Sequence, residues 1–69
     1  MDPYEQRCIE IATLANQKFP NLKIKSDDVE LYESTEGCFA EIFYEGQSLI
    51  KTEGCSYDRA LFHLKEKLR

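Results

Sequence analysis

The chain has 69 residues and a net charge of −4, with 42% hydrophobic and 32% charged residues. This composition is globular rather than disordered, and the length predicts one small domain over residues 1–69. No uncharged stretch approaches the roughly 18 apolar residues that a membrane span needs, so we expect no membrane partner. A chain this short has little room for both a core and a deep pocket, so we expect neither a cofactor nor a small-molecule substrate.

Three cysteines, Cys8, Cys38 and Cys55, cannot pair completely, and the acidic start of the chain resembles no secretory signal. Reduced thiols and a cytoplasmic location are therefore expected. Because there is no Cys-x-x-Cys pair and His63 is the only histidine, the sequence suggests no metal site. We expect the thiols, including Cys55, to pack in or beside the core.

The first segment predicts a helix that begins at Asp2 and ends before Pro20. Asp2 is a favourable N-cap, Pro3 suits the first helical position, and Pro20 disfavours helical geometry at the preceding residue. Apolar side chains recur at spacings of three and four and predict one buried stripe. Its members are Tyr4, Cys8, Ile11, Leu14 and Ala15.

Residues 22–32 alternate apolar and polar side chains, which predicts a strand. Ser26, Asp27 and Asp28 interrupt the alternation and indicate a bulge or a turn at that point. The register of this strand is open by one residue. A shift of one residue exchanges the buried and exposed faces of the sheet, so either face remains a candidate for burial.

A hairpin and a second helix are predicted next. Residues 34–37 form a turn in which Gly37 has a positive φ, and strands over residues 38–45 and 48–52 are joined by a tight turn at Gly46. Ser56 predicts the N-cap of the last helix, with Asp58 at its positive end. The apolar stripe of that helix comprises Tyr57, Ala60, Leu61, Leu64 and Leu68.

The predicted order is α-β-β-β-α, an α+β fold in which a three-stranded antiparallel sheet packs one face against two helices. This order resembles the double-stranded RNA-binding domain over nearly the whole chain. That family ends its third strand with a glycine, then has a serine cap and an alanine, which correspond here to Gly54, Ser56 and Ala60. Gly46 matches its turn glycine. Glu10 is the counterpart of a glutamate that reaches an RNA minor groove.

The RNA-contacting positions of that family differ in this chain. RNA-binding members begin the second helix with Lys-Lys-x-Ala-Lys, whereas residues 57–61 here read Tyr-Asp-Arg-Ala-Leu. The Gly-Pro-x-His loop of the family has no counterpart in residues 34–37. Because each phosphate contact needs a cation, we predict a degenerate member with RNA binding lost or weak. The residues available for weak RNA binding are Glu10, Arg59, Lys65 and Lys67.

Aromatic residues favour a protein partner or a second copy of the chain instead. Phe62 points away from the stripe of the last helix, and Phe39 and Phe43 share one face of a sheet whose other face is also apolar. Two helices cover only one of these faces, so we expect Phe62, Phe39 and Phe43 to contact a partner. An edge strand offers a further route, by strand addition.

A third hypothesis rests on the acidic middle of the chain, because residues 26–50 hold seven acids and no lysine or arginine. A small inhibitor or nucleic-acid mimic would place Asp27, Asp28 and Glu30 in a basic groove of a nucleic-acid-processing protein. We predict no enzyme. His63 and Cys55 have no spacing that ties them into a catalytic pair, and no paired-carboxylate motif or glycine-rich phosphate loop is present. Protein contact is thus the main hypothesis, with weak RNA binding and mimicry as the alternatives.

Overall fold

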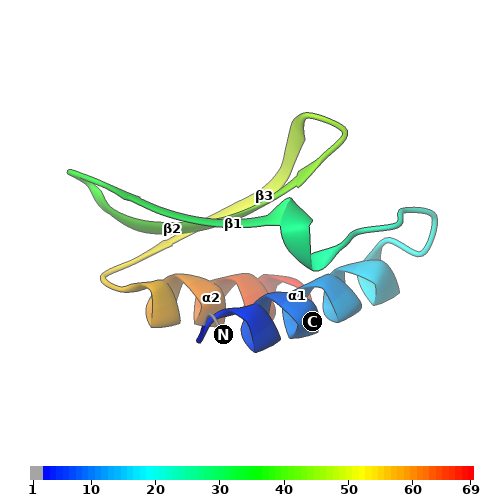
Figure 1. Cartoon of the computed structure of the whole chain (residues 1–69), viewed down its shortest axis with the longest axis horizontal. Helices are drawn as coiled ribbons and strands as arrows, with labels where there is room; N and C mark the ends of the chain where they lie inside the picture. The colour runs from blue at the N-terminus through cyan, green and yellow to red at the C-terminus, as the bar shows by residue number, and fades with distance from the viewer. Residues whose placement is uncertain (1–2) are drawn as a thin grey trace.

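The molecule consists of a sheet layer and a helix layer (Figure 1). The computed structural model describes residues 3–69, and β2 is the central strand, antiparallel to both neighbours. The elements are α1 (Glu5–Lys18), the 3₁₀ turn η1 (Ser26–Asp28), β1 (Val29–Ser34), β2 (Gly37–Tyr44), β3 (Gln47–Gly54) and α2 (Tyr57–Lys67). Both helices lie on one face of the sheet and run in the same direction. The predicted α-β-β-β-α fold is confirmed.

The start of α1 differs from the prediction. The first i to i+4 hydrogen bond of the helix joins the Cys8 backbone N to the Tyr4 carbonyl oxygen (2.9 Å), so the helix begins at Glu5 and Pro3 lies in a preceding turn. Asp2, the predicted N-cap, lies outside the described residues. The end of α1 agrees with the prediction, because the helix stops at Lys18, two residues before the proline.

The strand predicted over residues 22–32 is only partly correct, because β1 begins at Val29. The Asn16 side chain of α1 donates to the Ile24 carbonyl oxygen and accepts from the Ile24 backbone N, both at 2.8 Å. These two bonds satisfy the backbone groups that a strand partner would otherwise bond. Ile24 is buried, so its apolar character reflects packing against the core. The interruption predicted at residues 26–28 is η1.

Two turns and a bulge shape the sheet. The turn between β2 and β3 has two residues, Glu45 and Gly46, at φ values of 51° and 81°, which suits the right-handed twist of a hairpin. Gly37 has the predicted positive φ, at 138°. The pairing of β2 with β3 shifts between Ile42 and Phe43, which leaves Leu49 without a partner. Beyond this bulge the hairpin bends away from the helices (Figure 1).

Small residues allow the two layers to approach closely. Ala15 of α1, Ala40 of β2 and Ala60 of α2 are fully buried, and the largest fully buried side chains, Ile42 and Leu64, fill the space beside them. Because an alanine adds only one methyl group, the helix backbones lie close to the sheet at these points. The core comprises Ile11, Ala12, Ala15, Ile24, Val29, Ala40, Ile42, Ala60, Leu61, Leu64 and Leu68.

The closest approach is between α2 and the end of β3. A Cβ atom added to Gly54 would lie 2.6 Å from the Ala60 backbone N and 2.6 Å from the Arg59 Cβ. Thr52 lies two residues before Gly54 and shares its face of β3. The buried Thr52 hydroxyl lies 2.7 Å from the Ala60 carbonyl oxygen and 3.2 Å from the Ala40 carbonyl oxygen. The hydroxyl has one proton, and the nearer acceptor is the Ala60 carbonyl oxygen, so this hydrogen bond links β3 to α2 and fixes the rotation of α2 about its axis.

We expect Gly54→Ala to lower the free energy of unfolding by at least about 2 kcal/mol, because backbone atoms of α2 must move to admit the methyl group. Gly46→Ala is the matched control. Its methyl group meets nothing within 4 Å, and only the positive φ opposes it, at about 1 kcal/mol. Urea denaturation of both variants measures the difference. A loss for Gly54→Ala no larger than that for Gly46→Ala would contradict the close approach.

Candidate interaction surface

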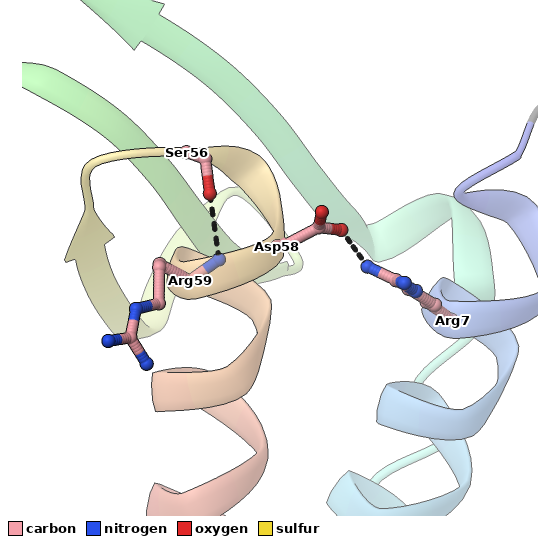
Figure 2. A network of polar contacts seen from close by, with 4 residues as sticks. All are labelled: Arg7, Ser56, Asp58 and Arg59. Carbon is pink, nitrogen blue, oxygen red and sulfur yellow. Dashed lines mark hydrogen bonds and ion pairs between the residues drawn. The ribbon is translucent and has the colours of Figure 1, made fainter.

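The first turn of α2 is fixed by a side-chain cap and by an ion pair with α1 (Figure 2). The Ser56 hydroxyl accepts a hydrogen bond from the Arg59 backbone N at 3.3 Å, which confirms the predicted N-cap. The Arg7 guanidinium reaches across from α1 and donates to the Asp58 carboxylate. In Figure 2 the Arg59 side chain extends away from this pair. The ends of the two helices are thereby joined, and the charge of Arg7 is neutralised within the chain.

The resemblance aligns three positions with lysines of the RNA-binding family, and all three side chains make contacts within this chain. Tyr57 packs edge to face on Tyr4, with 5.6 Å between the ring centroids, and burial followed by the charge of Glu33 raises the pKa of Tyr57. Asp58 holds the ion pair just described. Leu61 is only 4% exposed and belongs to the core. None of these three positions presents a cation to the solvent.

The four residues predicted for weak RNA binding are divided between two surfaces. Glu10 and Lys65 line the same hollow between the helices. Arg59 and Lys67 are exposed. They lie four residues before and four residues after His63 along α2, on a different flank of that helix from Lys65. The structure therefore brings together only the first pair, which combines opposite charges.

The hollow that Glu10 and Lys65 share is apolar at its base. Its volume is about 280 Å³. The buried side chains Ile11 and Leu61 belong to its lining, and so does Phe62, which is 50% exposed. The prediction that Phe62 points away from the sheet is confirmed. The complete lining is Arg7, Glu10, Ile11, Asp58, Leu61, Phe62 and Lys65.

A second hollow, of about 320 Å³, adjoins the first because Glu10 and Lys65 line both. It contains Ile9, which is 42% exposed. Together the two hollows form what we call the interhelix groove, defined by Ile9, Glu10, Ile11, Leu61, Phe62 and Lys65. Ile9 was missed by the sequence analysis. The available signal was an isoleucine one position off the predicted stripe of α1, on the otherwise polar side of the helix.

The outer face of the sheet is covered by its own side chains, contrary to the prediction of an uncovered apolar face. Phe39 is only 7% exposed. The Tyr32 ring stacks on it with 5.3 Å between centroids, and the Lys51 ammonium group lies 4.7 Å from the Phe39 centroid. β2 lies between β1 and β3, which supply Tyr32 and Lys51 respectively. These two side chains cover Phe39, so no further layer of structure is needed on this face. Phe43 is half-buried, and Phe39 offers little surface to a partner.

Glu41 lies next to this cluster on β2 and is only 6% exposed. The Tyr32 hydroxyl donates to its carboxylate at 2.6 Å, and this hydrogen bond is the main reason why the pKa of Tyr32 is raised. Burial raises the pKa of the Glu41 carboxyl. Hydrogen bonds from Ser48 and Tyr32, together with the charge of Lys51, outweigh burial, so the pKa of Glu41 lies below its ordinary value.

The acidic residues proposed for mimicry serve partly in folding. The Asp28 carboxylate accepts a hydrogen bond from the Lys25 backbone N at 3.0 Å and so closes η1. Asp27 and Glu30 are exposed, and they line a shallow hollow with Cys8 between η1 and α1. Two of the three predicted acids thus remain available to a partner.

The three cysteines differ in their exposure. Cys8 and Cys38 are half-buried as expected, but Cys55 is exposed, because it lies in the bend between β3 and the capped end of α2. His63 is exposed, as predicted, and its Nδ1 lies 2.7 Å from the Glu53 carbonyl oxygen. Among residues 3–69, no group of three or more histidine, cysteine or acidic side chains is placed to hold a metal ion. No helix in this range is long and apolar enough to cross a membrane.

Comparisons with known proteins found no match, whether against protein-family models, curated proteins or solved structures. The resemblance to the double-stranded RNA-binding domain therefore rests on the element order and the framework residues Gly54, Ser56 and Ala60.

The lowered pKa of Glu41 predicts an acid-sensitive contribution to stability. A carboxyl group whose pKa is lower in the folded than in the unfolded state stabilises the fold above its ordinary pKa, and this contribution is lost as the pH falls through the folded-state value. We expect the unfolding free energies of the native chain and Glu41→Gln to converge below about pH 5. Tyr32→Phe, which removes a donor to Glu41, should also flatten the pH dependence. Parallel curves for the native chain and Glu41→Gln in urea denaturation would contradict this explanation.

Proposed function

We propose that this chain is a small non-catalytic interaction domain that contacts another protein, with a fold like that of the double-stranded RNA-binding domain and RNA binding lost or weak. The observation that carries the proposal is Phe62, an aromatic side chain that is half exposed beside an apolar hollow. Burial of an aromatic anchor in a partner is a common source of interface energy. Glu10 and Lys65 supply the polar rim that such anchors usually have.

The state of the family's RNA-contacting positions supports this proposal over RNA binding. A phosphate at the start of α2 would meet the Asp58 carboxylate, and Arg7, the nearest cation of α1, is already paired with that group. Release of Arg7 for a phosphate would leave Asp58 without its partner beside a negative backbone. The electrostatic free energy of such a contact is therefore small or unfavourable.

The distribution of charge supports the same proposal. Residues 26–54, which form the sheet and its turns, contain eight acids and one lysine. α1 has two acids and two cations, and residues 57–69 have two acids and four cations. Residues 19–25 add two lysines and no acid. The excess of positive charge is therefore divided between this connection and two flanks of α2. A duplex RNA needs several cations on one surface.

The acidic sheet layer favours one alternative, the small inhibitor that imitates nucleic acid. Asp27 and Glu30 are exposed on neighbouring elements, as such a surface requires. The role of Asp28 in closing η1 and the burial of Glu41 reduce the number of acids available for it. A protein contact through the helix layer can use Phe62, Glu10 and Lys65, which lie outside the hydrophobic core.

Titration of a labelled RNA duplex of about 20 base pairs distinguishes protein contact from RNA binding. At low salt and at physiological salt we expect no binding that weakens steeply with salt, because no surface collects enough cations. Because no such binding is expected, Arg59→Glu and Lys67→Glu should give the same flat titration as the native chain. Salt-dependent binding that these substitutions abolish would overturn the proposal and favour the RNA-binding alternative.

A further inference from the structure

We propose that the partner at the interhelix groove is a second copy of this chain, in a two-fold symmetric dimer that pairs Glu10 of each copy with Lys65 of the other. This inference rests on the proposed function and names the partner. A two-fold interface uses the same patch on both copies, so the patch must be complementary to itself. The interhelix groove meets this condition in both shape and charge.

The shape condition concerns Phe62 and the hollow beside it. A cavity of about 150 Å³ is large enough to hold a benzene ring, and the hollow between the helices has a volume of about 280 Å³. The hollow thus has room for the Phe62 ring of a second copy, which would rest on the buried side chains Ile11 and Leu61. Because Phe62 also lines its own hollow, the two rings would lie against each other near the two-fold axis.

The charge condition concerns Glu10 and Lys65. They have opposite signs, they lie on different helices, and both line the two adjoining hollows. Neither side chain forms a hydrogen bond or an ion pair with another of residues 3–69. Arg7 and Asp58, at the end of the groove, already neutralise each other. In a two-fold arrangement Glu10 of one copy can therefore meet Lys65 of the other twice, without breaking any contact within a copy.

The distribution of charge favours dimer contact through the helix layer over contact through the outer face of the sheet. Two chains of net charge −4 repel each other most strongly where their sheet layers meet, since residues 26–54 hold eight acids and one lysine. The interhelix groove contains as many positive as negative side chains. The outer sheet face, by contrast, has its aromatic residue covered by Tyr32 and Lys51. A second copy thus finds both the exposed apolar surface and the least repulsion at the helix layer.

Sedimentation equilibrium of the full chain, from about 10 µM to 1 mM at physiological salt, tests the inference with charge-reversal variants, because weak interfaces of small proteins fall in this range. We expect the native chain to dimerise and Glu10→Lys and Lys65→Glu each to weaken the dimer at least tenfold, because like charges then meet at two contacts. An equimolar mixture of these two variants should restore the dimer as a heterodimer, since opposite charges meet again at both contacts. Phe62→Ser should also abolish dimerisation.

Lys67→Glu is the matched control for Lys65→Glu. It makes the same change of net charge on the exposed flank of α2, away from the groove, and should leave the dimer largely intact. Circular dichroism checks that every variant is folded. A native chain that stays monomeric to 1 mM, equal losses for Lys65→Glu and Lys67→Glu, or a mixture that fails to restore the dimer each overturns the second copy as partner. Such results would not overturn the proposed function of protein contact, because the RNA titration tests that proposal separately.

Discussion

The contact between α2 and the end of β3 determines the arrangement of the rest of the molecule. Gly54 has no side chain, so the backbone at Ala60 can lie directly against the strand, and the Thr52 hydroxyl bonds to the Ala60 carbonyl oxygen. These contacts fix both the distance and the rotation of α2. Once the rotation is fixed, Leu61 and Leu64 must enter the core. Side chains on the opposite flank must then face α1 or the solvent.

The interhelix groove is a consequence of that rotation. Helix geometry places Asp58, Phe62 and Lys65 on one flank of α2, and the side-by-side position of α1 brings Arg7 and Glu10 to the same place. Arg7 and Asp58 form an ion pair within the chain, whereas the side chains of Glu10 and Lys65 stay unpaired. This framework thereby presents a neutral, partly apolar surface. We propose that this surface binds protein.

The outer face of the sheet is stable without a third layer, because its own side chains cover its central aromatic residue. A contiguous apolar patch on an open sheet face marks an interaction site more often than a covered one does. Here Phe39 is on the central strand, and the edge strands supply Tyr32 and Lys51 to cover it. Glu41 is satisfied by the same neighbours. The cost of a buried carboxylate is offset by hydrogen bonds, so this face needs no second molecule to be stable.

The order of the elements, the Ser56 cap, the turn at Gly46 and the outward position of Phe62 could be predicted from the sequence, because each depends on residues within a few positions. The tertiary structure alone decided the remainder. The Asn16 side chain bonds both backbone groups of Ile24 in place of a strand partner, and Arg7 joins Asp58 across 51 positions of the chain. Such contacts depend on how helices and strands are placed relative to one another. That placement follows from close packing of the whole core, which a local sequence pattern does not specify.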